Sequence, residues 1–259
     1  MNIRGLTGIL SASIAVHGYS ADVGVPENIS AWIETEASFV EGHPLWYAAN
    51  GYGTVWDVYM AGGAIKVREY RFEEQEVRTI DVPGGQLSCD NRGEWGAKVF
   101  WKPVGGDDVE LSKHSVRRFF RVSESIFAIA GLAHMATNEG EVLRFSSEGK
   151  SWKVTRLCKL VDEPQVVAVE NERTFLVLTY SGLSRVSLDG RQELLVVSAP
   201  WNGLHPRSLV VGNDGFAYVG FSQRVAKVDL ETGDVRFLIP FEGIFEKDLE
   251  KMRRTKKKR

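Results

Sequence analysis

Two histidines of the 259-residue chain occupy the same local context. Gly42-His43-Pro44 and Leu204-His205-Pro206 each place an imidazole one residue before a proline, and we expect a strand to begin directly after each pair. An imidazole there could act as an acid or base near neutral pH. Nearby aromatic rings could stack on a sugar face, and arginines would attract an anion. The predicted ligand-binding residues are His43, Trp46, Arg117, Trp201, His205 and Arg207.

A structural interpretation of the same residues stays open. A residue before proline is restricted to extended backbone, so each His-Pro pair could simply set a loop conformation. The paired carboxylates that a glycosidase needs are absent from the predicted inner strands, and the nearest acids are Asp90, Asp162 and Glu163, in turns or loops. The sequence has no Cys/His cluster with metal-ligand spacing, no phosphate-binding loop and no serine nucleophile motif. We therefore predict no metal and no cofactor.

An internal repeat positions these residues. Residues 164–177 align without gaps on residues 206–219, at an offset of 42 residues. Each copy contains four short strands separated by turn signals such as Asn213-Asp214-Gly215. Short strands at this spacing indicate a sandwich, a barrel or a propeller, and four strands per repeat of about 40–45 residues favour the propeller.

Fainter units extend the pattern toward the N-terminus. Residues 29–40 contain a strand that we expect to close the ring with the last unit, because closure removes free sheet edges. The blade pattern of residues 44–240 resembles β-propeller repeat proteins of the NHL-like and quinoprotein-like kind. This resemblance implies an all-β propeller of five four-stranded blades, with six as the alternative, and it transfers no activity. The units start near Pro44, Gly84, Arg117, Pro164 and Pro206.

The unit that starts at Arg117 differs from the others by an insertion. Compared with the later units, its register slips by about six residues between the second and third strands. The extra chain lies at residues 131–138, which we expect to form an enlarged hairpin loop. Unusual loops on a rigid scaffold tend to carry function. His134 and Met135 in this loop are therefore a second candidate site.

The hydrophobic spacing becomes helical after residue 240. Phe241, Ile244, Phe245, Leu249 and Met252 recur every three or four residues, which predicts one amphipathic helix over residues 242–254. We expect this helix to pack on the propeller; binding to a partner is the alternative.

The two cysteines are predicted to be free thiols. Cys89 falls in an inner strand of one unit and Cys158 in the outer strand of the next. Such strands lie about two or more steps of ~4.8 Å apart. A disulfide requires Cα atoms within about 7 Å of each other.

The two ends of the chain differ from its body. Residues 1–21 have a basic start, an uncharged apolar stretch and small residues near Ser20, which is the layout of a secretory signal peptide; a buried first element is the alternative. The last nine residues hold seven basic side chains, leaving 25 of the 32 Lys+Arg against 34 Asp+Glu in the remainder. An acidic body argues against a nucleic-acid partner. We interpret the basic tail as a solvated terminus, with contact to anionic lipid as the alternative.

These observations predict a signal peptide at residues 1–21, a propeller at residues 22–240 and a helix with a basic tail at residues 241–259. No apolar run approaches the roughly 20 residues that span a bilayer. The expected function is that of an exported, periplasmic or secreted, non-enzymatic protein that binds a protein, a sugar or an anionic ligand. One alternative is a lyase or hydrolase that acts on a polysaccharide-like substrate at the mouth of the propeller's central channel, with His43 or His205 as acid or base. The other is a cytoplasmic scaffold that retains residues 1–21.

Overall fold

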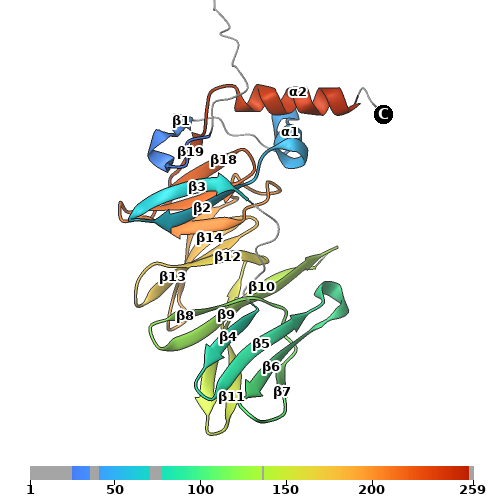
Figure 1. The fold of residues 1–259 in the computed structure, drawn as a ribbon, viewed down its shortest axis with the longest axis vertical. Helices are drawn as coiled ribbons and strands as arrows, with labels where there is room; N and C mark the ends of the chain where they lie inside the picture. The colour runs from blue at the N-terminus through green and yellow to red at the C-terminus, as the bar shows by residue number, and fades with distance from the viewer. Residues whose placement is uncertain (1–24, 36–40, 71–77, 136, 257–259) are drawn as a thin grey trace, which may run out of the picture.

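The computed structural model describes residues 25–35, 41–70, 78–135 and 137–256, and these residues form a series of antiparallel sheets (Figure 1). The predicted all-β fold class is confirmed, with a short helix near each end of the described chain. The predicted signal peptide lies outside the described residues. Among the described helices, none is long and apolar enough to cross a membrane.

Three sheets in the middle of the chain each contain four strands. Every strand pairs with the next one along the chain, so each sheet is a meander with its first strand at one edge. The strands are β4 (Thr79–Val82), β5 (Gly85–Asn91), β6 (Ala97–Pro103), β7 (Val109–Ser112), β8 (Val116–Val122), β9 (Ser125–His134), β10 (Thr137–Glu148), β11 (Ser151–Leu160), β12 (Pro164–Val169), β13 (Thr174–Thr179), β14 (Gly182–Ser187) and β15 (Gln192–Val197).

The last sheet contains five strands because an N-terminal strand joins it. β1 (Ile33–Thr35) follows the 3-10 helix η1 (Ile29–Ala31) and pairs with β19, Ile33 lying opposite Ile239. A strand within residues 29–40 thus pairs with the last unit, as predicted, and residues 36–40 lie outside the described residues. The remaining strands of this sheet are β16 (Ser208–Val211), β17 (Phe216–Phe221), β18 (Arg224–Asp229) and β19 (Val235–Ile239).

The unit predicted to start near Pro44 begins with a helix, so the expected strand after His43-Pro44 is wrong. α1 (Pro44–Tyr52) has Pro44 in its first turn, where a missing N–H costs nothing. His43 is the N-cap, and its Nδ1 accepts a hydrogen bond from the Leu45 N–H at 3.2 Å. The helix buries Ala48 and Ala49 completely. It is followed by a two-stranded sheet of β2 (Trp56–Ala61) and β3 (Ala64–Glu69).

The first strands of neighbouring sheets contact one another in the order β4, β8, β12, β16 and β2. The hydrophobic clusters lie between consecutive sheets, so a sheet such as β12–β15 buries both of its faces. A strand buried on both sides has no polar face, which explains the continuous apolar runs at residues 126–130 and 175–178. The described residues form five sheets, and one of them, β2–β3, has two strands in place of the four that each predicted unit contains.

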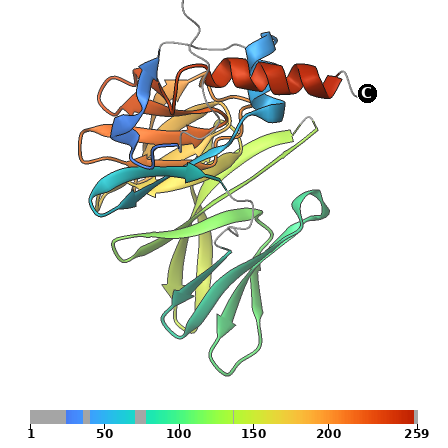
Figure 2. The same ribbon diagram turned by 45° about the horizontal axis from the view of Figure 1, so that its top comes forward.

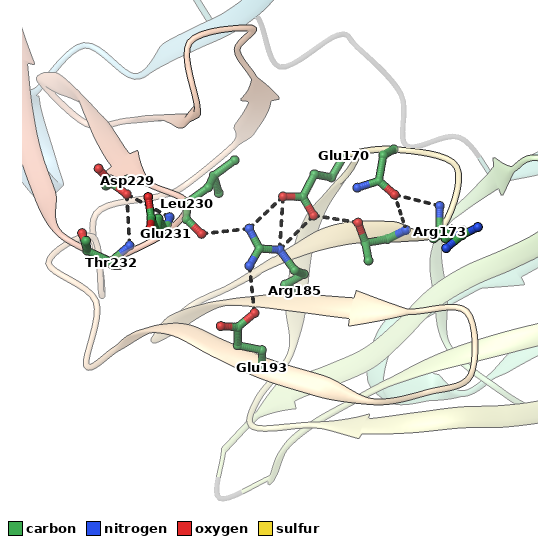
Figure 3. Close-up of polar contacts among 10 residues, drawn as sticks. Glu170, Arg173, Arg185, Glu193, Asp229, Leu230, Glu231 and Thr232 are labelled. Atoms are coloured by element: carbon green, nitrogen blue, oxygen red, sulfur yellow. Dashed lines mark hydrogen bonds and ion pairs between the residues drawn. The ribbon is translucent and has the colours of Figure 1, made fainter.

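A partly buried arginine joins the last two sheets (Figure 3). Arg185 on β14 donates from Nε and Nη2 to the carboxylate of Glu170, at 2.8–3.1 Å. Its Nη2 also donates to the Leu230 carbonyl at 2.8 Å, and its Nη1 donates to Glu193 at 2.8 Å. The planar guanidinium thereby links the end of β12 to the turn after β18.

The predicted C-terminal helix is confirmed as α2 (Ile244–Lys256), and it packs on its own domain. Ile244 is buried, and the ring of Phe245 lies 5.4 Å from the Arg224 guanidinium. Arg224 also lies over Phe237 at 4.9 Å, and burial lowers its pKa to about 10. Asp248 accepts a hydrogen bond from the Gln223 side chain at 2.6 Å. Buried polar and apolar contacts together therefore hold this helix.

The predicted hairpin loop at residues 131–138 is mostly paired strand, which corrects its expected conformation. β9 continues to His134 and β10 begins at Thr137, with these two residues paired across the tip. The insertion thus lengthens two strands into a ribbon that projects beyond β8 (Figure 1). A paired ribbon holds its side chains more firmly than an open loop would.

Both cysteines are free in the structure, as predicted. Cys158 lies in β11, the outer strand of its sheet. Cys89 lies in β5, the second strand of its sheet and therefore one of its two inner strands.

Candidate ligand-binding groove

Two adjoining hollows lie beside the β9–β10 ribbon, and the smaller one also borders the β5–β6 hairpin. In both views these hairpins extend toward the same side of the molecule (Figures 1 and 2). The hollows measure 330 Å³ and 140 Å³, and both are lined by Ser115, Gly131 and Leu132. We call the combined space the hairpin groove. Its other charged and polar lining residues are Arg78, Asn91, Lys113, His114, Arg117, Thr137, Glu139, Glu141, Arg156 and Lys159.

A histidine and a glutamate face each other in the larger hollow. His114 lies in the connection that leads into β8, and its Nε2 is 3.5 Å from Oε1 of Glu141 on β10. The second oxygen of Glu141 is 3.7 Å from Nε of Arg156 on β11. One carboxylate is thus shared between an imidazole and a guanidinium, which brings three separate segments to one point.

Neighbouring backbone contacts fix the position of His114. Its carbonyl accepts a hydrogen bond from the Val116 N–H at 3.0 Å, and the thiol of Cys89 lies 3.9 Å from the same oxygen. Its Nδ1 is buried and has no hydrogen-bond partner among the residues that the structure describes. This nitrogen retains donor or acceptor capacity toward a molecule in the groove.

A buried ion pair supports the smaller hollow. Arg117 on β8 donates through Nη2 to Glu163, whose side chain is only 2% exposed. The other oxygen of Glu163 accepts from Nε2 of Gln165 at 3.0 Å, and its backbone N–H donates to the side chain of Asn138 at 2.8 Å. The guanidinium is thereby fixed at the groove wall, and the ribbon is tied to the segment that precedes β12.

Two paired glycines let the ribbon lie against that same segment. Gly131 and Gly140 are opposite each other on β9 and β10. A Cβ on Gly140 would lie 2.1 Å from the Asp162 carbonyl, and one on Gly131 would lie 2.7 Å from the Pro164 ring. Side chains at either position would displace the ribbon. The close approach therefore determines the direction in which the ribbon projects.

The hairpin groove is positively charged although the body of the chain is acidic. Lys113, Arg156 and Lys159 line the larger hollow, and Arg78 and Arg117 line the smaller one. The acidic lining residues are Glu139 and Glu141, and Glu141 already lies beside two cationic or titratable groups. A polar cleft of one sign concentrates ligands of the opposite charge. This arrangement suits a carboxylate or phosphate group.

The structure divides the residues that were predicted to bind a ligand between two regions. Arg117 lies at the hairpin groove, and His134 and Met135 lie at the tip of the ribbon. The other residues lie around α1 and the connection between β15 and β16, in the upper part of Figure 1. A single mouth containing all of them is therefore not formed.

Around α1, the candidates make local contacts. Trp46 Nε1 donates to the Asn202 carbonyl at 3.3 Å, and its ring lies against Gly203, where a Cβ would come within 2.5 Å of it. Trp201 is fully buried, and its Nε1 donates to the Thr179 carbonyl at 3.2 Å. Packing and hydrogen bonds to the backbone thus account for the positions of both indole groups.

The two His-Pro histidines serve opposite ends of α1. His43 caps its start, whereas His205 hydrogen-bonds to the backbone of Asn50 near its end. Burial lowers the pKa of His205, and the charge of Arg207 adds to this effect. His205 also adopts a left-handed backbone with φ of 56°, which differs from the extended conformation expected before proline. A ligand-binding role for these residues stays a prediction.

His114, Glu141 and Arg156 were not singled out from the sequence. These residues lie on the connection before β8, on β10 and on β11, and only the pairing of the strands brings them together. One signal was available for His114, because it precedes Arg117 by three residues and thus enters the first strand of a unit. The same reasoning that selected His205 could have selected it.

A second, larger hollow of 670 Å³ lies between η1, β3 and the last sheet. Asp214 there accepts a hydrogen bond from the Tyr218 hydroxyl at 2.7 Å and lies 3.7 Å from Lys227 Nζ. Burial and the Asp214 carboxylate raise the pKa of Tyr218. Lys227 in turn lies 4.0 Å from the centre of the Phe216 ring. Two carboxylates, Glu34 and Asp214, and one cation, Lys227, line this hollow, so it suits an anion less well than the hairpin groove does.

No group of three or more possible metal ligands occurs among the described residues. No model of a known protein family matches the chain, and no curated protein matches it.

Several solved structures of propeller type are similar to the chain, without indicating one family. The streptogramin B lyase has a TM-score of 0.42 and 11% identity, with 82% of this chain and 74% of that chain covered. The WD40 beta-propeller domain of Doa1 has a TM-score of 0.28 and 16% identity, covering 64% and 69%. The AtxE2 isopeptidase has a TM-score of 0.38 and 11% identity. The similarity covers 62% of this chain and only 28% of the isopeptidase chain. These likenesses assign no activity to the chain.

Proposed function

We propose that this protein binds an anionic ligand in the hairpin groove. The observation that carries this proposal is the concentration of Lys113, Arg156, Lys159, Arg78 and Arg117 around two connected hollows on an acidic body. Charge-assisted hydrogen bonds from such side chains to carboxylate or phosphate are stronger than neutral ones.

The groove also has the rigidity that selective binding requires. Arg117 is fixed by the buried carboxylate of Glu163, and Arg156 lies beside Glu141. Preorganised side chains lose less conformational freedom when a ligand binds. Lys113 and Lys159 are exposed, so they supply charge that attracts the ligand from solution.

Isothermal titration calorimetry with citrate tests this proposal, because citrate carries three carboxylates of suitable size. We expect saturable binding that weakens as salt is raised, since exposed charges are screened within about 10 Å at 0.1 M ionic strength. The variant Lys159→Glu should weaken binding about ten- to hundredfold, because a hydrogen bond to a charged group contributes about 1.5–3 kcal/mol.

Lys153→Glu is the matched control. Lys153 lies on the same strand as Lys159, is 57% exposed and pairs with Glu148, outside the groove. It changes the net charge of the protein by the same amount. Equal effects of the two variants would show that citrate responds to net charge and would reject a site in the groove.

We further propose that the five sheets are five blades of a propeller and that the protein is exported after removal of residues 1–21. The pairing of β1 with β19 and the successive contacts of β4, β8, β12, β16 and β2 support the first statement. The basic and apolar pattern of residues 1–21 supports the second. N-terminal sequencing of the mature protein tests export, since a chain that begins at Met1 would contradict it.

A further inference from the structure

The ribbon has a backbone edge beside the groove that can accept another strand. The N–H of Gly131 points out of the ribbon and donates to the Ser115 carbonyl at 3.0 Å. In an antiparallel pair alternate residues direct their backbone groups to the same side. The N–H and carbonyl of Ala133 therefore point to the same side of the ribbon as those of Gly131. The neighbouring strand β8 begins at Val116, opposite Ala130, so it does not extend as far as Ala133.

Two large hydrophobic side chains are exposed near the tips of the β9–β10 ribbon and the β5–β6 hairpin. Met135 at the ribbon tip is 94% exposed, and Trp95 in the β5–β6 hairpin is 82% exposed. Trp95 belongs to the short helix η2 (Gly93–Trp95), which contacts β9, and Gly93 lines the smaller hollow. Tryptophan and methionine are enriched at the cores of protein interfaces. An occupant of the groove would therefore meet apolar contacts at the tips and positive charge along the base.

We propose that the hairpin groove is the docking site for an extended, acidic peptide segment of a partner protein. The peptide would add a strand along Ala133, in line with β8, by the mode known as β-augmentation. Its acidic side chains would meet Lys113 and Lys159, and its apolar side chains would contact Trp95 and Met135. This inference rests on the anion-binding function proposed above and specifies the class of ligand.

The test uses a fluorescently labelled ten-residue peptide of alternating glutamate and valine, with both ends blocked. Fluorescence anisotropy should show that the full-length protein binds this peptide at least tenfold more tightly than it binds the corresponding peptide of alternating lysine and valine. The same peptide with methylated backbone nitrogens should bind at least fivefold more weakly, because it lacks the N–H groups that a strand donates. Equal binding of the methylated peptide would overturn the added strand.

The variant Ala133→Pro isolates the backbone edge. It removes an N–H that faces away from the ribbon and changes no charge, and proline is tolerated at such an edge position. We expect a five- to tenfold loss of peptide affinity, while citrate affinity changes by less than twofold. Wild-type peptide affinity in this variant would overturn the proposal and leave the anion-binding function intact. If the wild-type protein binds neither citrate nor the peptide, the proposed function itself fails.

The variants Trp95→Ala and Met135→Ala give a second measurement in case Ala133→Pro does not fold. Each should weaken peptide binding at least threefold and leave citrate binding unchanged. Val104→Ala is the matched control, since Val104 is 85% exposed in the turn between β6 and β7. If Trp95→Ala and Met135→Ala bind the peptide as well as the control does, docking between the hairpins is wrong.

Discussion

The imidazole Nε2 of His114 lies 3.5 Å from Oε1 of Glu141, across the larger hollow of the hairpin groove. The two residues come from the connection before β8 and from β10, so their meeting depends on the pairing of three strands. The same carboxylate lies 3.7 Å from Arg156. Glu141 thus lowers the positive charge of the groove at its centre.

Replacing Glu141 with glutamine should strengthen citrate binding about two- to fivefold. The substitution removes a negative charge that competes for Arg156, and exposed or half-exposed pairs contribute about 0.2–1 kcal/mol. Calorimetry on Glu141→Gln measures this change. Glu148→Gln, on the same strand but 59% exposed and paired with Lys153, should leave affinity unchanged. Weaker binding by Glu141→Gln would mean that the carboxylate positions its neighbours more than it repels the ligand.

Gly140→Ala should lower the free energy of unfolding by about 1–3 kcal/mol, as overpacking of a tight contact usually does. The added methyl group would meet the Asp162 carbonyl at 2.1 Å, which forces the ribbon away from its support. Urea denaturation followed by tryptophan fluorescence measures the change. Gly51→Ala is the control, because that position in α1 has open space around it. Equal stability of Gly140→Ala and the wild type would show that the ribbon is not held by this contact.

The link between Arg185 and Glu170 should make stability depend on pH in the acid range. Burial alone would raise the pKa of Glu170, but hydrogen bonds from Arg185 and Thr174 outweigh it and hold the pKa below its ordinary value. A lowered carboxyl pKa contributes stability above the unfolded pKa of about 4.3, and this contribution is lost as pH falls through the folded pKa.

The comparison of wild type with Glu170→Gln measures that contribution. The difference in unfolding free energy should be constant near pH 7 and shrink below about pH 4. A difference that stays the same from pH 7 to pH 3 would show that the charge of Glu170 is not the source of its stabilising effect.

Cys158 should react slowly with alkylating reagents in the folded protein. Burial raises the pKa of its thiol to about 11. The thiolate is the reactive form, and at pH 7.5 its population should be roughly 300-fold lower than that of a free cysteine with a pKa of about 8.5. Pulsed iodoacetamide labelling and mass spectrometry, with and without urea, measure this. A Cys89–Cys158 disulfide found under non-reducing conditions would contradict the strand order itself.

The last sheet was predictable from local signals because its turns are marked in the sequence. The turn signal Asn213-Asp214-Gly215 lies between β16, which ends at Val211, and β17, which begins at Phe216. α1 was not predictable in this way, because a nine-residue helix is marginal alone and depends on tertiary packing, here of Ala48 and Ala49.

The candidate site was predictable only in part. The insertion at residues 131–138 and Arg117 were recognised, but the ribbon conformation was not, since a two-residue turn can extend strands of any length. His114 and Arg156 meet at Glu141 only after β8, β9, β10 and β11 have paired in register. A one-residue shift would turn each of these side chains to the other face of the sheet.

The position of a bound anion tests the account most directly. Two-dimensional ¹H–¹⁵N NMR during a citrate titration reports which backbone amides sense the ligand. The account predicts the largest shifts at Ser115, Gly131 and Leu132, which line both hollows of the groove. Shifts centred on Trp46 and His205 around α1, or no saturable shifts at all, would contradict it.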